Sequence, residues 1–315
     1  MKIVILDALT VTNGDINLDM FSVYGEVVQY GLSSPEEIPE RVSGADIILC
    51  NKTVLGENEL KNAQKLKLIC LFATGYNNID TVYCTKRGIC VCNAGTYSTE
   101  SVAQHTFALI LEHFSRVGDY DKFVQEGNWL NSPKFSMFVY ASDELFGKTL
   151  GIVGLGSIGL RVAKIAKAFG MRVIASTRTP KNIEGICEVP YDELLESSDI
   201  ISFHCPLTDK TRGMFGRDEI AKCKNGAFIV NTARGAVIDE FALAKAVKSG
   251  KLSGAGIDVL AKEPMTSSCP LIGVENIIIT PHVAWTPYTT RDRLCRIVSD
   301  NIEAFIKGNP NNKVN

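Results

Sequence analysis

The sequence of 315 residues carries almost no net charge, few histidines and no paired-cysteine motif. Its formal net charge is −2 at pH 7, so we expect neither a nucleic acid nor an anionic membrane as a partner. The chain has only four histidines, and none of its ten cysteines stands in a CxxC pair, which argues against a metal site. Free, reduced thiols are therefore expected, and these are typical of a cytoplasmic protein.

Long apolar runs and leader-like segments are also missing. Met1 and Lys2 lead directly into a strand-like segment, Ile3 to Leu6, so no signal peptide is expected. No apolar run has the length of a transmembrane helix. With 45% hydrophobic and 22% charged residues, the composition is that of a globular protein, and the length suffices for two domains.

The clearest motif is a glycine-rich turn between an apolar strand and an amphipathic helix. The strand-like run Leu150 to Val153 leads into Gly154, Gly156 and Gly159, and a helix-like apolar pattern follows. Gly154 would allow a tight turn, Gly156 would let the backbone approach a pyrophosphate, and Gly159 would let the helix pack closely on the strand. Free N–H groups at the helix start would bind the phosphates. A second strand, Met171 to Ala175, completes the unit, which predicts a dinucleotide site.

Strand-like and helix-like segments alternate along the chain, which predicts parallel sheets covered by helices. In the first 97 residues the expected strands are Ile3–Leu6, Asp46–Cys50, Leu68–Phe72 and Ile89–Asn93, with helices at Glu57–Gln64 and Asp80–Arg87. After the glycine turn the expected strands are Arg172–Ser176, Ile200–His204, Ala227–Asn231, Gly254–Val259 and Asn276–Thr280, with helices at Tyr191–Ser197, Arg217–Ala221 and Glu240–Ser249. A last amphipathic helix, Pro287 to Lys307, is expected to return to the first domain.

Two features of the first domain concern ligand binding. Asp7 follows the first strand where a glycine turn would be needed, so this domain is not expected to hold the pyrophosphate. The third strand runs into Ala73-Thr74-Gly75, whose backbone N–H groups could bind a small carboxylate. The alternative is an ordinary strand-to-helix turn, with Asn78 or Asp80 as the helix cap.

A long helix is expected over residues 98–116, and its apolar positions cover more than half of its circumference. Such a helix is buried on several sides. Residues 118–146 are less regular and rich in aromatic side chains, which is typical of a partner surface, although local packing would also account for them.

Polar residues follow three strands of the second domain and should meet at one edge of the sheet. They include Arg234 and His282, and Glu263 lies between them in the sequence. Arginine can bind a carboxylate through two parallel N–H bonds, histidine can transfer a proton, and an acid can hold the histidine tautomer. We interpret these three as catalytic. His204 is expected to lie near the cofactor, and His105 and His113 are expected to pack in a helix or face solvent.

Taken together, these motifs resemble those of the D-isomer-specific 2-hydroxyacid dehydrogenase family over nearly the whole chain. The matching segments are Gly154–Gly159, His204–Thr208, Val230–Gly235, Asp258 with Glu263-Pro264, and Thr280–His282. Two further segments, Tyr97–His105 and His282–Trp285, are most similar to the glycerate dehydrogenase (hydroxypyruvate reductase) branch.

The resemblance implies an oxidoreductase that transfers a hydride from NAD(P)H to a small 2-keto acid, with hydroxypyruvate or glyoxylate favoured, to give the D-2-hydroxy acid. Arg234 would bind the substrate carboxylate, and His282, paired with Glu263, would be the acid/base. The implied substrate-binding residues are Ala73, Thr74, Gly75, Arg234 and His282. The implied cofactor contacts are Gly154, Gly156, Ser157, Ile158, Gly159, Thr177, Arg178, His204, Cys205, Pro206, Thr211, Thr232, Ala233, Arg234, Asp258, His282 and Ala284.

The implied fold is α/β, with two doubly wound parallel-sheet domains. A Rossmann dinucleotide-binding domain, residues 99–285, would be inserted into a flavodoxin-like substrate domain, residues 1–98 and 286–315. Members of the family are usually dimers joined through the glycine-bearing domain, so a homodimer is expected.

One position departs from the family pattern. Thr177 and Arg178 stand where NAD-preferring members carry an acid at the end of the second strand. This favours NADP(H), with NAD(H) possible if Arg178 merely faces solvent. A dinucleotide-sensing, corepressor-like interaction protein on the same fold is the alternative from another functional class.

Overall fold

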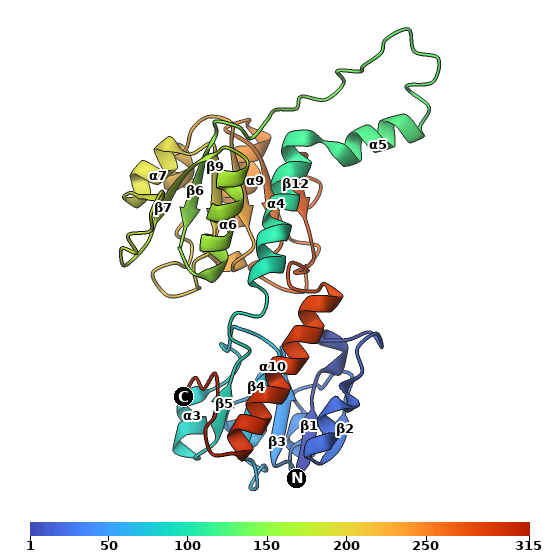
Figure 1. The fold of residues 1–315 in the computed structure, drawn as a ribbon, viewed down its shortest axis with the longest axis vertical. Helices are drawn as coiled ribbons and strands as arrows, with labels where there is room; N and C mark the ends of the chain where they lie inside the picture. Colours follow the sequence, from blue (N-terminus) through green and yellow to red (C-terminus); the bar gives the residue numbers. More distant parts are fainter. The chain divides into compact units, whose positions relative to one another are not determined.

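The computed structural model describes residues 1–315 and divides the chain into two compact α/β units. The first unit consists of Met1–Ser98 and Trp285–Asn315, and the second is the intervening segment Thr99–Ala284 (Figure 1). The predicted fold class is confirmed, because each unit has a parallel sheet covered by helices on both faces. None of the helices is long and apolar enough to cross a membrane.

The first unit contains a five-stranded parallel sheet with the strand order β2-β1-β3-β4-β5, which is that of flavodoxin-like folds. Its strands are β1 (Lys2–Ile5), β2 (Glu26–Gln29), β3 (Ile47–Cys50), β4 (Leu68–Leu71) and β5 (Cys90–Cys92). Its helices are α1 (Ile38–Arg41), α2 (Glu57–Leu60), α3 (Thr81–Lys86) and α10 (Tyr288–Ile306), with 3₁₀ turns at Ala8–Thr10 and Leu18–Tyr24.

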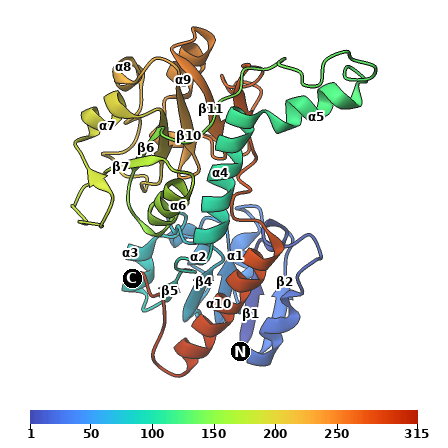
Figure 2. The same ribbon diagram turned by 45° about the horizontal axis from the view of Figure 1, so that its top comes forward.

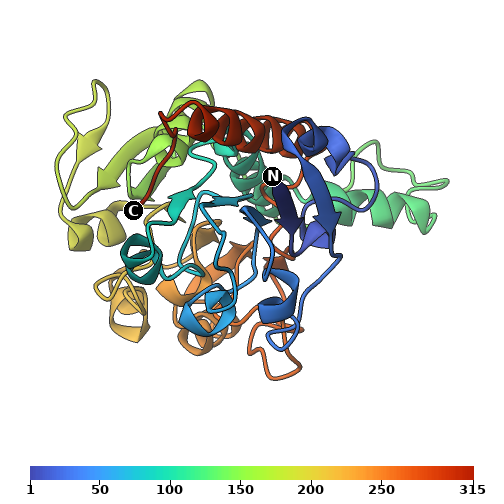
Figure 3. The ribbon, with the colours of Figure 1, turned by 90° about the horizontal axis from the view of Figure 1, so that it is seen from below.

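The sheet of the first unit is buried on both faces, which explains why its strands are almost wholly apolar. On one face, Leu294, Val298 and Ile302 of α10 pack against alternate residues of the strands. On the other face, residues of α1, α2 and α3 pack against the remaining strand residues. Figure 3 shows α10 along one side of the sheet and the three short helices along the other.

The second unit contains a seven-stranded parallel sheet with the strand order β12-β11-β10-β9-β6-β7-β8. Counted from β6, this is the Rossmann order 3-2-1-4-5-6 with one strand added. The strands are β6 (Thr149–Val153), β7 (Arg172–Ser176), β8 (Cys187–Glu188), β9 (Ile200–Phe203), β10 (Ala227–Asn231), β11 (Leu252–Ile257) and β12 (Ile277–Ile279). The helices are α4 (Thr99–Ser115), α5 (Val117–Gln125), α6 (Ser157–Ala168), α7 (Tyr191–Ser197), α8 (Arg217–Lys222) and α9 (Glu240–Lys248), with a 3₁₀ turn at Gly235–Val237.

Two apolar layers hold the helices of the second unit on its sheet. Helices α4 and α6 cover one face, where Phe107, Ile110 and Val162 are buried against the strands. Helices α7, α8 and α9 cover the other face (Figure 2). Asp239 caps α9 by accepting hydrogen bonds from the N–H groups of its first turn, and the left-handed Gly250 follows its end.

Several elements differ from the sequence-based expectations, among them the short helix α1 and the two-residue strand β8, which were not expected. The edge strand β2 was not predicted, because only Val27 and Val28 give it an apolar character and both are half-buried. Helix α2 ends at Leu60 rather than Gln64. The segment expected to be irregular begins with helix α5, and Figures 1 and 2 show α5 and the loop after it extending away from the body of the second unit.

Candidate active site

The glycine turn between β6 and α6 has the geometry that its sequence predicts. Gly154 adopts the left-handed φ of 98°, which L side chains rarely adopt. A Cβ atom on Gly159 would lie 2.2 Å from the carbonyl oxygen of Gly154, so only glycine permits this contact between helix and strand. In contrast, a Cβ on Gly156 would meet nothing within 4 Å. The helix and the turn are therefore in close contact at Gly159, whereas the space beside Gly156 is open.

This open side suits a pyrophosphate. Gly156 is the N-cap of α6, and the N–H groups of Ser157, Ile158 and Gly159 form the first turn of the helix. The first N–H groups of a helix have no intrahelical acceptor, and the helix dipole adds positive potential there. No side chain accepts a hydrogen bond at the N-cap, so the position is free for an anionic group. The residues present thus fit a dinucleotide.

All the predicted cofactor contacts lie beyond the carboxyl ends of strands of the second unit. After β6 come the glycine turn residues, after β7 Thr177 and Arg178, after β9 His204, Cys205, Pro206 and Thr211, after β10 Thr232, Ala233 and Arg234, after β11 Asp258, and after β12 His282 and Ala284. In open parallel sheets this edge is where ligands bind, at the point where the strand order reverses, here between β6 and β9.

A carboxylate that the sequence did not point to lies at the end of β7. Glu188 of β8 accepts a hydrogen bond from the Thr177 hydroxyl at 2.6 Å. Its other oxygen accepts the N–H groups of Lys181 and Asn182, both at 2.7 Å. These bonds, that of Thr177 above all, hold the pKa of Glu188 below its usual value. The Thr177 hydroxyl, which has a single hydrogen, thus lies within hydrogen-bond distance of two acceptors in its own unit, the Glu188 carboxylate and the carbonyl of Thr179 at 3.0 Å.

Arg178, in contrast, is exposed and forms no ion pair or hydrogen bond. Its guanidinium is therefore available to a ligand at the end of β7. Only two residues form β8, and Ala175 of β7 pairs with Glu188 across the sheet. Because that pairing cannot be read from so short a strand, the contact of Glu188 with Thr177 had no signal in the sequence.

Beyond β9, His204 is held as a neutral side chain. Its Nε2 lies 2.8 Å from the Ser202 hydroxyl, and burial lowers the pKa of His204 to about 3. His204 therefore adds no positive charge at neutral pH.

Thr211 donates its hydroxyl to the carbonyl of Pro206 and accepts the N–H of Thr208, so it closes the loop that follows the strand.

The loop after β10 presents Arg234. The buried Asn231 donates to the carbonyl of Arg234 and accepts the N–H of Ala233, which fixes the loop. A Cβ on Gly235 would lie 1.9 Å from the carbonyl carbon of Leu260, so this glycine lets the loop after β11 approach closely. The same loop carries Glu263. The close approach of the two loops therefore brings Glu263 near Arg234, although the two residues are far apart in the sequence.

Glu263 and His282 form a hydrogen-bonded pair. Nδ1 of His282 lies 2.7 Å from Oε2 of Glu263, and Oε1 of Glu263 accepts the N–H of Leu260 at 2.8 Å. Because Nδ1 is bonded to the carboxylate, Nε2 is the ring nitrogen left for a substrate. Arg234, Glu263 and His282 line one cavity of about 200 Å³.

The backbone at His282 is unusual and is held by Asp258. His282 has a φ of 55°, and its N–H bonds to the carbonyl oxygens of Asp258 at 2.8 Å and of Thr280 at 2.9 Å. The Asp258 carboxylate accepts the N–H groups of Val283 and Ala284 at 2.9 and 3.0 Å, and the Thr280 hydroxyl at 2.6 Å. Burial would raise the pKa of Asp258, but the hydrogen bonds from His105, Thr280 and the two N–H groups outweigh it and keep this pKa below its usual value. Asp258 thus ties together the turn that carries His282.

The first unit places its two sequence features at the carboxyl edge of its own sheet. Thr74 follows β4 and donates its hydroxyl to the carbonyl of Gly95. Asp80 accepts the N–H of Tyr83 and caps α3, as one alternative expected. Asp7 is buried, and its carboxylate accepts the N–H groups that follow β3, those of Asn51, Lys52 and Thr53.

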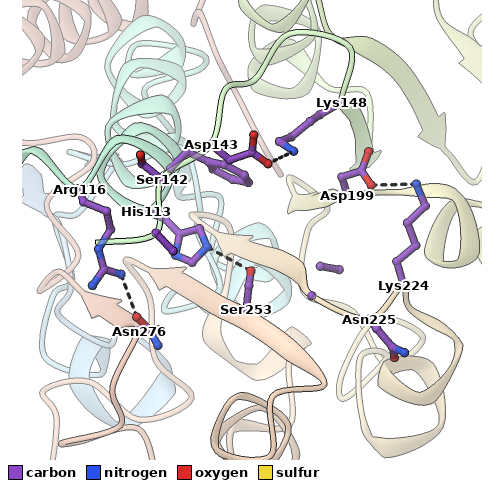
Figure 4. Close-up of a pocket in the computed structure, with 14 residues that line it drawn as sticks. His113, Arg116, Ser142, Asp143, Lys148, Asp199, Lys224, Asn225, Ser253 and Asn276 are labelled. Atoms are coloured by element: carbon purple, nitrogen blue, oxygen red, sulfur yellow. Dashed lines mark hydrogen bonds and ion pairs between the residues drawn. The ribbon is translucent and has the colours of Figure 1, made fainter. Parts of the chain in front are cut away.

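A larger cavity of the second unit, of about 570 Å³, lies at the opposite edge of its sheet (Figure 4). It is lined by residues that precede or begin strands, among them Asp199, Asn225 and Asn276. Its lysines are ion-paired, Lys148 with Asp143 and Lys224 with Asp199, and His113 bonds to Ser253. None of the predicted site residues lines this cavity, so we do not regard it as the active site.

The two helical histidines behave differently. His113 is partly buried and packs against a neighbouring side chain, one of the two environments expected, with its ring stacked 4.1 Å from that of Phe228. His105 instead reaches the active-site turn, since its Nε2 lies 2.9 Å from Oγ1 of Thr280 and 3.4 Å from Oδ1 of Asp258. The sequence gives His105 apolar neighbours, Val102 and Ala103, but does not show which strand this side of α4 faces.

Comparisons with known proteins show which family the chain belongs to. The family model of the "D-isomer specific 2-hydroxyacid dehydrogenase, NAD binding domain" matches residues 107–284. A "Hydroxypyruvate reductase" of Blautia hydrogenotrophica is 40% identical, over 100% of both chains.

Among solved structures, an "Acyclic imino acid reductase (Bsp5) in complex with NADPH and D-Arg" superposes with a TM-score of 0.89 at 30% identity, over 100% of both chains. A D-lactate dehydrogenase from Aquifex aeolicus, complexed with NAD and lactic acid, superposes with a TM-score of 0.84 at 30% identity, over 98% of this chain and 96% of that chain. The chain therefore belongs to the D-isomer-specific 2-hydroxyacid dehydrogenase family, and its second unit is the nicotinamide-dinucleotide-binding domain of that family.

Proposed function

We propose that this protein reduces a small 2-keto acid, hydroxypyruvate or glyoxylate above all, to the D-2-hydroxy acid. The observation that carries the proposal is the shared cavity of Arg234, Glu263 and His282, in which a proton donor and a carboxylate-binding group meet. The name of the Blautia hydrogenotrophica relative points to the same substrate class.

The side chains would divide the reaction among them. Arg234 binds the substrate carboxylate through its planar guanidinium and places the neighbouring carbonyl near His282. The reduced nicotinamide supplies the hydride that reaches the carbonyl carbon. His282 gives the proton from Nε2 to the carbonyl oxygen, and Glu263 keeps Nδ1 protonated and stabilises the imidazolium before transfer. We propose that Ala73, Thr74 and Gly75 add backbone N–H groups that bind substrate.

We further propose that NADPH is preferred over NADH. The support comes from Arg178, whose exposed and unpaired guanidinium lies at the end of β7, where the adenosine ribose of a Rossmann cofactor binds. A guanidinium can bind a 2′-phosphate through paired hydrogen bonds. Glu188 is already bonded to three groups of its own loop, which leaves it less free to accept ribose hydroxyls as an NAD-selecting acid does.

We propose that the protein is a homodimer in which the segment after α5 covers a second copy. Phe135 and Phe138 are 93% and 92% exposed, and Trp129 and Leu130 are also exposed. Aromatic side chains rarely stay exposed in such number on one segment of a monomer, and they are enriched in interfaces. A second copy is the partner that supplies the same apolar segment in return, as a two-fold interface requires.

One experiment separates this function from the corepressor-like alternative. The purified protein is assayed with hydroxypyruvate, glyoxylate, pyruvate and a bulkier 2-keto acid, each with NADPH and with NADH. We expect turnover, with the highest kcat/KM for hydroxypyruvate or glyoxylate. Dinucleotide binding without turnover of any 2-keto acid would contradict the proposal and favour the interaction protein.

A further inference from the structure

We propose that His105 is a positioning residue for the reaction, which acts through Thr280 and Asp258 to hold the turn that carries His282. This inference rests on the proposed function, in which His282 is the proton donor. His105 lies on α4 and is 177 positions away from His282 (282 − 105), but its ring reaches the end of β12. It touches neither Glu263 nor the side chain of His282.

The hydrogen bonds fix the tautomer of His105. The Thr280 hydroxyl has one hydrogen, and it donates that hydrogen to Oδ1 of Asp258 at 2.6 Å. Thr280 can therefore only accept at its contact with Nε2 of His105, 2.9 Å away. Nε2 must carry a hydrogen, which also points toward Oδ1 of Asp258 at 3.4 Å. The neutral ring is thus the Nε2–H form. The hydrogen bonds among His105, Thr280 and Asp258 require only an N–H donor at the position of Nε2.

This donor stabilises a strained turn. Non-glycine residues with positive φ cost on the order of 1–3 kcal/mol and persist where the surroundings hold them. At His282 the surroundings are the main chain and carboxylate of Asp258, together with the carbonyl of Thr280. His105 orients the Thr280 hydroxyl toward Asp258, so the carboxylate keeps the hydrogen bonds that it accepts from the N–H groups of Val283 and Ala284. A change in that carboxylate would rotate the ring of His282 away from Glu263.

His113 provides a control on the same helix. It lies eight positions further along α4 (113 − 105), and its Nε2 also bonds to a hydroxyl, that of Ser253 at 3.1 Å. Ser253 belongs to the amino end of β11, at the edge of the sheet opposite to the active site. Loss of His113 therefore tests what removal of a helical histidine does to the fold, without touching the turn of His282.

The test compares the variants His105→Leu, His105→Gln, Thr280→Val and His113→Leu with the wild type. We expect His105→Leu to lower kcat about 10- to 100-fold with a much smaller change in the KM for the dinucleotide, since small misplacements of a catalytic group cost that much. Thr280→Val should reproduce this loss, and the double variant should be no worse than either single one. His105→Gln should recover most of kcat, because its amide N–H replaces Nε2–H. His113→Leu should keep kcat within threefold of wild type.

A second measurement does not depend on activity. Imidazole ¹⁵N spectra of histidine-labelled protein should show His105 as the Nε2–H tautomer, and the His282 ring signals should move in His105→Leu and Thr280→Val but not in His113→Leu. The chain has four histidines, so the signals can be assigned by substitution. Unmoved His282 signals in both variants, or an Nδ1–H tautomer at His105, would overturn the inference. A wild type that reduces no 2-keto acid but shows the expected signals would instead contradict only the proposed function.

Discussion

Nδ1 of His282 and Oε2 of Glu263 lie 2.7 Å apart, although 19 positions separate the two residues in the sequence. Both side chains are partly exposed. The N–H of Leu260 donates to Glu263, and the main-chain carbonyl of Asp258 accepts the N–H of His282, so each partner is also held by the backbone. An imidazole fixed at Nδ1 can work as an acid only through Nε2. The geometry therefore leaves Nε2 as the ring nitrogen through which His282 could exchange a proton with a ligand.

The first prediction is that His282→Ala lowers kcat for keto-acid reduction by about 10²- to 10⁴-fold, the usual effect of a positioned general acid. The dinucleotide Kd, measured by fluorescence, should change much less. A kcat within tenfold of the wild type would remove His282 from this role. In the companion variant Glu263→Gln, the pH profile of reduction should move to lower pH, because the imidazolium loses its carboxylate partner.

For Arg234, we predict that substitution by lysine raises the KM for the keto acid by about tenfold, since a lysine keeps the charge but not the planar fork. The control is Arg217→Lys at the start of α8, which lies away from the cavity. Steady-state kinetics at saturating dinucleotide measure both. An unchanged KM in the Arg234 variant would mean that the arginine only supports its loop.

The third prediction concerns the dinucleotide. Arg178→Ser should lower kcat/KM for NADPH by about tenfold or more and leave that for NADH nearly unchanged, as expected for loss of a charge-assisted hydrogen bond. Arg172→Ser, at the other end of β7, is the matched control. A wild type that prefers NADH by tenfold would show that Arg178 does not select the cofactor, and would make Glu188 the residue to vary next.

A fourth prediction addresses the aromatic segment after α5. The double variant Phe135→Ser/Phe138→Ser should sediment as a monomer under conditions in which the wild type sediments as a dimer. The exposed Phe241 of α9 offers a control of the same residue type, so Phe241→Ser should remain dimeric. Equal sedimentation of the wild type and the double variant would contradict the proposed interface.

The last prediction is a pH dependence of stability. Burial lowers the pKa of His113 to about 4, against about 6.5 in an unfolded chain. Between these values the unfolded chain binds a proton that the folded protein resists, so the free energy of unfolding decreases as the pH falls from 6.5 toward 4. His113→Gln should reduce the difference in unfolding free energy between pH 7.5 and pH 5 by at most about 2 kcal/mol, because His113 is partly exposed. An unchanged difference in urea titrations would assign the effect to other groups.

Much of the active site could be predicted because its signals are local. The glycine turn needs only neighbouring residues, and Arg234, Asp258 and His282 each follow a strand that the apolar pattern identifies. Parallel strands then bring these residues to one edge without any further information. The pairing of His282 with Glu263 was predicted from motif position, and the structure places the two within hydrogen-bond distance.

The residues that were missed depend on contacts between distant elements. Glu188 reaches Thr177 only because β8 pairs with β7 in one particular register. His105 reaches Thr280 because α4 lies across the sheet near β11 and β12, and the rotation of a helix with an apolar surface on several sides cannot be derived from its sequence. Partial burial similarly hid the edge strand β2.

The buried carboxylate of Asp7 makes the two units differ in how the backbone donors at their sheet edges are satisfied. Both units are wound in the same way, and in the first the strand order also reverses, between β1 and β3. There the backbone donors that an outside anion would need are already taken by Asp7. In the second unit the donors at the start of α6, which follow the first strand β6, are taken by no side chain. The first unit thus satisfies these donors with an acid of its own, whereas the glycine turn of the second unit keeps its donors open to a phosphate from outside.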